Sequence, residues 1–102
     1  MSMQIVCAAI QSRNLIRFNY TGDAVSGLRI VEPHMIAYTR ADNLALSAWF
    51  VSGASESQVV GWKTYLLEYM DAISVLPQQF AGPRPGYVPG GGKSFHNVQC
   101  EI

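Results

Sequence analysis

The residues best suited to chemistry in this 102-residue chain are aromatic rings and cations that alternate along segments with strand periodicity. The rings are Tyr20, Trp49, Trp62, Tyr65 and Tyr69, and the cations near them are Arg17, Arg29 and Lys63. On a curved sheet, rings of this kind stack against bases while the cations hold phosphate. The alternative is that most of the rings fill the core and the cations form a solvated rim.

Signatures of catalysis are weak. Residues 90–94, Gly-Gly-Gly-Lys-Ser, resemble a phosphate-binding loop, but that motif requires glycine where Tyr87 stands, as well as a flanking strand and helix. His34 and His96 are the only histidines, and no His or Cys pair has the spacing of zinc ligands. The sequence also lacks a nucleophile elbow. We therefore expect no catalytic residue, no metal and no cofactor, and we do not expect an enzyme.

Composition limits the class of protein. Hydrophobic residues make up 49% of the chain and charged residues 14%, and seven lysines and arginines balance seven aspartates and glutamates. One small domain of this composition can bury a core, so a disordered chain is excluded. The zero net charge argues against broad electrostatic binding to duplex DNA or to an anionic membrane.

Targeting signals and cysteines point to the cytoplasm. The N-terminus lacks a basic region followed by a long apolar run, and no stretch is apolar enough to cross a membrane. Cys7 and Cys100 lie near opposite ends of the chain. Without a secretory signal, we expect both thiols to be reduced and the protein to be cytoplasmic.

The hydrophobic periodicity predicts one helix followed by strands. Residues 2–13 are predicted to be a helix because Met3, Val6, Cys7 and Ile10 share one face, with Asn14 at its end. Period-two alternation then predicts five strands, at 15–20, 28–38, 44–52, 59–67 and 72–76. Pro33 marks a bulge, a bend or an edge in the second of these, and Pro77 ends the fifth.

This succession predicts a mainly β fold, a small bent sheet closed into a five-stranded barrel after one short N-terminal helix. Residues 81–94 are rich in glycine and proline, which predicts a flexible C-terminal tail over 81–102. Residues 95–102 could form a strand, although the sequence indicates no partner for it.

The order of these segments resembles the WYL domain family. Residues 15–20 are similar to its opening strand, residues 29–33 (Arg-Ile-Val-Glu-Pro) to its Arg-x-Val-x-Pro segment, and Trp49-Phe50-Val51 stands where Trp-Tyr-Leu is expected. Residues 63–70 resemble the family's basic run and residues 73–80 its closing strand. The resemblance covers about residues 2–80 and implies an SH3- or Sm-like barrel preceded by a helix, so the domain is placed at 1–80.

The resemblance also implies a function. It suggests a bacterial regulatory module that senses a nucleotide-like ligand or single-stranded nucleic acid and acts in transcriptional or defence regulation with a partner. The pocket residues implied by position are Tyr20, Arg29, His34, Trp49, Phe50, Lys63 and Tyr65. Leu66 and Tyr69 replace two arginines of the family's basic run and Lys63 a third, which should weaken anion binding.

A second interpretation comes from the low charge. A chain with 14% charged and 49% apolar residues has little to keep its copies apart. The alternative function is therefore a protein-interaction module that assembles into a homo-oligomer without a small ligand.

Overall fold

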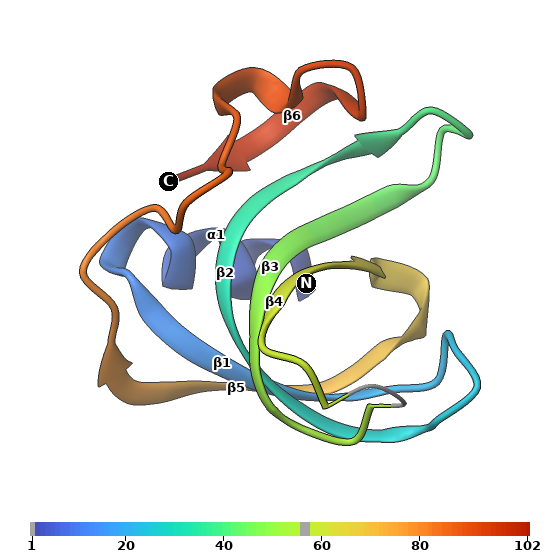
Figure 1. The fold of residues 1–102 in the computed structure, drawn as a ribbon, viewed down its shortest axis with the longest axis vertical. Helices are drawn as coiled ribbons and strands as arrows, with labels where there is room; N and C mark the ends of the chain where they lie inside the picture. Colours follow the sequence, from blue (N-terminus) through green and yellow to red (C-terminus); the bar gives the residue numbers. More distant parts are fainter. Residues whose placement is uncertain (1, 56–57) are drawn as a thin grey trace.

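A computed structural model describes residues 2–55 and 58–102 of the chain. This part contains a helix, six strands and two short 3-10 turns, in the order α1 (Ser2–Ser12), β1 (Asn14–Tyr20), β2 (Gly27–Thr39), β3 (Leu44–Gly53), β4 (Gly61–Leu66), η1 (Leu67–Tyr69), β5 (Met70–Gln79), η2 (Pro89–Gly91) and β6 (Phe95–Glu101) (Figure 1). The predicted mainly β class with one N-terminal helix is confirmed. The predicted five strands are present, and β6 is a sixth.

Helix α1 exists because one of its faces is apolar and packs on the sheet. Val6 and Ile10 are buried in the core, as the periodicity predicted, and Ala9 is buried beside them, while Met3 and Cys7 of the predicted face are partly buried against the core. The helix is followed by Arg13 at a left-handed φ of 59°, not by a left-handed Asn14 as predicted. Asn14 instead starts β1, and its side-chain amide donates to the carbonyl of Leu76 at 2.9 Å.

The strands form one antiparallel sheet in the order β4-β3-β2-β1-β5, with β6 also paired to β2. Figure 1 shows β2 curving between β1 at one end and β6 at the other. The first part of β2 pairs with β1 (Val31 with Ile16) and the second part with β6 (Met35 with Glu101). The ladder to β3 shifts register between Pro33 and Met35, which confirms the predicted irregularity at a residue that has no N–H to donate.

The fifth strand is longer than predicted and runs through Pro77 to Gln79. The β1–β5 ladder shifts register between its Asn14–Gln79 and Ile16–Val75 pairs. Proline is tolerated because β5 pairs only with β1 among the described strands and because this stretch of the ladder is irregular.

The curled sheet encloses the core but is not a closed barrel. Residues of α1 and of strands β1, β2 and β3 meet there, including Ile10, Phe18, Ile36 and Leu46. In the described part of the chain no ladder joins β4 to β5; η1 connects them directly. The Tyr20 hydroxyl accepts a hydrogen bond from the Leu66 backbone N–H at 2.9 Å, so a side chain bridges the ends of β1 and β4.

The C-terminal segment, predicted as a flexible tail over 81–102, is attached to the sheet at several points. Beyond the β2–β6 ladder, the Arg84 guanidinium donates to both carboxylate oxygens of Glu32, at 2.7 and 2.8 Å. The Tyr87 hydroxyl donates to the Glu101 carboxylate within the segment itself. Glu32 is far from Arg84 in the sequence, and Tyr87 lies in a glycine-rich stretch. Local periodicity therefore does not indicate either contact.

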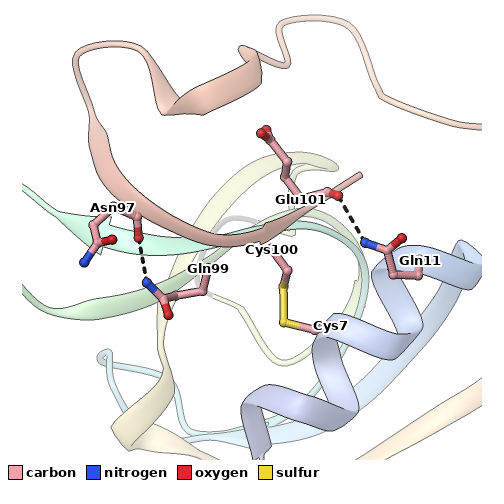
Figure 2. The surroundings of a disulfide bond; sticks show 6 residues. All are labelled: Cys7, Gln11, Asn97, Gln99, Cys100 and Glu101. Carbon is pink, nitrogen blue, oxygen red and sulfur yellow. Dashed lines mark hydrogen bonds between the residues drawn. A yellow bond between two sulfur atoms is a disulfide. The ribbon is translucent and has the colours of Figure 1, made fainter.

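A disulfide joins Cys7 of α1 to Cys100 of β6, across 93 positions of sequence. Figure 2 shows the two side chains meeting between the helix and the last strand, next to the hydrogen bond from the Gln11 amide to the Glu101 carbonyl. The expectation of reduced thiols is therefore wrong. Cys7 and Cys100 are far apart in the sequence, but the fold brings them together. Because the expectation of reduced thiols is wrong, it no longer supports a cytoplasmic location.

No helix among the described residues combines the length and the apolar character that a membrane crossing requires.

Candidate functional site

The predicted pocket residues fall into two groups on the sheet. Trp49 and Phe50 are neighbours on β3, so their side chains point to opposite faces. Phe50 belongs to the inner group, together with Tyr20, Arg29, Lys63 and Tyr65, which we call the arginine cluster. His34 and Trp49 belong to the outer group, under the C-terminal segment.

The arginine cluster is centred on a fully buried guanidinium. Arg29 has no exposed side-chain surface, and its Cζ atom lies 5.3 Å from the ring centroid of Tyr20 and 5.9 Å from that of Tyr65. The two rings meet edge to face, with centroids 5.0 Å apart. A cation against two aromatic faces is stabilised electrostatically, and more strongly when water is excluded. Strands β1, β2 and β4 each contribute one of these side chains.

The negative partner of Arg29 comes from an exposed loop. The Nη2 and Nη1 atoms of Arg29 donate to the two carboxylate oxygens of Asp23 at 2.9 and 3.2 Å, and Nη2 also donates to the Val25 carbonyl. The Asp23 side chain is 53% exposed, whereas that of Arg29 is 0% exposed. This hydrogen bond from Arg29 is the main cause that lowers the pKa of Asp23. The charge pair is thus buried on one side only.

Two buried polar atoms lie at the centre of the cluster, Arg29 Nε and the Tyr65 hydroxyl. The guanidinium of Arg29 is the hydrogen-bonding neighbour of the Tyr65 side chain, and this contact opposes the effect of burial on the pKa of Tyr65. Burial raises the pKa of Tyr65 to about 12, so the hydroxyl keeps its proton at neutral pH. Arg29 and Tyr65 are thus partners of each other, and the group of this cluster that solvent reaches is the Asp23 carboxylate.

Lys63 adds a second cation. Its Nζ atom lies 2.8 Å from Ser55 Oγ and 5.0 Å from the ring centroid of Phe50. After the stronger effect of Arg29, Lys63 also contributes to lowering the pKa of Asp23, which places both cations near one carboxylate. A guanidinium and an ammonium near one exposed carboxylate can bind another anion.

The outer group is an aromatic cluster around His34. The His34 ring is fully buried, with ring centroids 4.7 Å from Trp62, 5.2 Å from Phe80 and 5.6 Å from Tyr87. The Arg84 backbone N–H donates to Nε2 at 3.2 Å, so Nδ1 carries the proton and donates to the Glu32 carbonyl at 2.8 Å. Burial lowers the pKa of His34, which favours this neutral form.

Trp49 is held in the same outer layer. The Arg84 guanidinium, already paired with Glu32, lies 5.1 Å from the ring centroid of Trp49, and Trp62 meets that ring edge to face. His34 and Trp49 therefore support the C-terminal segment, and the structure does not bring them together with the arginine cluster.

Sequence reasoning missed Asp23 and Ser55, which partner the two cations, and Arg84 and Tyr87, which cover the outer group. Asp23 and Ser55 lie in loops, where no periodicity marks a contact. Arg84 and Tyr87 lie inside a glycine- and proline-rich stretch. A charged and an aromatic side chain in such a stretch are the signal that could have indicated packing of the segment against the sheet. Comparison of the chain with family models, with curated proteins and with solved structures gave no match.

Proposed function

We propose that this chain is a WYL-like regulatory module whose arginine cluster binds the phosphate of a nucleotide or of a single-stranded nucleic acid end. The observation that carries the proposal is the buried Arg29, held between Tyr20 and Tyr65, whose carboxylate partner Asp23 lies on an exposed loop. The strand order β4-β3-β2-β1-β5 and the leading helix support the family resemblance, although in the described part of the chain the sheet stays open between β4 and β5.

The chemistry is an exchange of anions. A phosphate oxygen pair can replace the Asp23 carboxylate on the fork of Arg29, because both present two acceptors at similar spacing. Leu66 and Tyr69 contribute no charge where the family has arginines, so the site suits one phosphate better than a polyanion. Signalling would then pass from the loop that carries Asp23 to a partner protein.

The test is a titration followed by amide chemical shifts, with nucleoside monophosphates, dinucleotides and short single-stranded oligonucleotides as ligands. We expect shifts at Asp23, Arg29, Lys63 and Tyr65. Asp23→Asn removes the competing charge and should raise the affinity for a mononucleotide about tenfold, while Asp71→Asn, an exposed carboxylate change on β5, should not. Titrations that leave the arginine cluster unshifted in both the wild type and Asp23→Asn would overturn the proposal.

A homo-oligomer is the second candidate. Among the described strands, β4 and β5 each pair on one side only, and exposed apolar side chains lie beside them, Val60 before β4 and Val75 within β5. Free strand edges with apolar side chains are templates for pairing between copies. Light scattering over a concentration series distinguishes the two candidates, because a monomer at every concentration counts against assembly.

A further inference from the structure

We infer that the chain has a second ligand site, distinct from the arginine cluster, which takes a small, neutral, planar nitrogen heterocycle. It is a cavity of about 300 Å³ between the C-terminal segment and the outer faces of β2, β3 and β4. A volume of this size lies at the lower end of the range for small-molecule sites and suits one fused ring system.

Each side of the cavity contributes rings and hydroxyls. From the sheet come Trp62 and Thr64, which share the outer face of β4, and Ser47, which is the register partner of Thr64 on β3. From the C-terminal segment come Tyr87, Ser94 and Phe95. Aromatic faces provide stacking area, and hydroxyls provide groups that both donate and accept hydrogen bonds.

The Trp62 and Tyr87 rings at the cavity are held in place by hydrogen bonds of their polar atoms. Trp62 Nε1 donates to the Pro85 carbonyl at 2.8 Å, and the Tyr87 hydroxyl donates to the Glu101 carboxylate. The two rings are stacked, at 27° with centroids 6.2 Å apart, and Trp62 also meets His34 and Trp49 edge to face. A planar ligand would extend this aromatic cluster on the side that borders the cavity.

The polar groups at the cavity favour an uncharged ligand. The hydroxyls of Ser47, Thr64 and Ser94 make no side-chain hydrogen bond within the described part of the chain. No aspartate, glutamate or histidine among the described residues lines the cavity. Lys63 borders it, but its ammonium is engaged by Ser55 and lies near the ring of Phe50 on the opposite face of the sheet. Ring nitrogens and exocyclic groups of a heterocycle fit hydroxyl partners of this kind.

The wall formed by the C-terminal segment is held in place by its glycines and its anchors. Gly86 has a φ of +92°, and a Cβ there would lie 3.0 Å from Trp62 Nε1; Gly91 has a φ of +89°, and a Cβ there would lie 2.6 Å from the Cβ of Phe95. Both positions therefore require glycine for the close approach. The Arg84–Glu32 pair and the Cys7–Cys100 disulfide fix the segment on either side of the cavity.

The experiment uses adenine, benzimidazole and benzoate as probes of the full chain, with amide shifts mapped at saturation. We expect adenine and benzimidazole to shift residues 35, 47, 62–64 and 86–95, with the amide of Arg29 unmoved, and benzoate to bind more weakly. The double variant Ser47→Ala/Thr64→Val keeps the shape and removes two hydroxyls, so the adenine affinity should fall roughly three- to tenfold. Ser74→Ala on β5 is the matched control.

Thr64→Trp is a second variant, which fills the cavity from an exposed position and should abolish adenine binding while leaving the folded spectrum intact. The inference is overturned if neither heterocycle binds at millimolar concentration, if their shifts map to the arginine cluster, if benzoate binds as well as adenine, or if Thr64→Trp binds normally. Mononucleotide binding to Asp23→Asn is measured separately, so failure here and failure of the phosphate site are distinguishable.

Discussion

The two fully buried basic side chains, Arg29 and His34, are accommodated in different ways. Arg29 stays charged, because a carboxylate and two aromatic faces surround it. His34 is held neutral, because a backbone N–H points at one ring nitrogen and a carbonyl accepts from the other. Protonating His34 would place a second hydrogen where Arg84 donates, inside a layer of rings. Protonation of His34 is therefore expected to lower the free energy of unfolding.

The free energy of unfolding should fall as the pH drops below about 6.5. Burial lowers the pKa of folded His34, so between its ordinary and its lowered pKa the unfolded chain binds more protons than the folded one. Stability consequently rises with pH through this window. Urea unfolding between pH 5 and 7 measures the slope, which His34→Gln should flatten, and His96→Gln on the exposed part of β6 is the control. An unchanged slope in His34→Gln contradicts the assignment.

At the scale of elements, β2 organises the molecule by changing partners at Pro33. Its first half pairs with β1 and its second half with β6, while β3 runs along the other side. Glu32, next to this bend, points into the outer layer and receives the guanidinium of Arg84. Glu32, which holds the C-terminal segment through Arg84, therefore lies next to the bend in β2.

Glu32→Gln should loosen that segment without unfolding the sheet. Replacing the carboxylate removes one charge from the bidentate pair that anchors Arg84 to the sheet. We expect the amides of residues 84–94 and the indole N–H of Trp62 to exchange with deuterium several-fold faster, while amides of β1 and β3 are unchanged. Glu68→Gln on η1 is the control. Uniform acceleration throughout the sheet would indicate general destabilisation instead.

The elements that alternate locally were predictable, and those defined by distant partners were not. Residues 15–20 and 44–52 alternate polar and apolar side chains, and β1 and β3 follow them closely. Residues 95–102 could form a strand by their own pattern, and β6 lies there, but its partner, the second half of β2, is distant in the sequence and was not indicated. In the candidate site, Arg29 and Tyr65 come from strands and were predicted, whereas Asp23 is joined to them only by the course of a loop.

At the scale of the whole molecule, the disulfide ties the first element to the last. Cys7 lies in the apolar face of α1, and Cys100 packs against the same core from β6. Because the bond closes nearly the entire chain into a loop, it restricts the unfolded state far more than the folded one. The bond therefore stabilises the fold as a whole, by lowering the conformational entropy of the unfolded chain.

Cys7→Ser/Cys100→Ser should lower the free energy of unfolding by about 2–5 kcal/mol, the range for native disulfides in small domains. The loss arises mainly from the gain in freedom of the unfolded chain. Guanidinium unfolding of the wild type and the variant measures the difference. Dithiothreitol should bring the wild type to the same midpoint and leave the variant unaffected; equal midpoints without reductant would contradict this prediction.

The same bond determines how the molecule bears mechanical load. A force applied between the two ends passes from residue 7 to residue 100 through the sulfur atoms, so the residues between them carry no tension. An oxidised molecule pulled at its ends should lengthen only at its extremities. After reduction, the intervening residues would be released and add roughly 310–330 Å of contour length. Single-molecule stretching measures this gain in contour length, which is expected only in the presence of reductant.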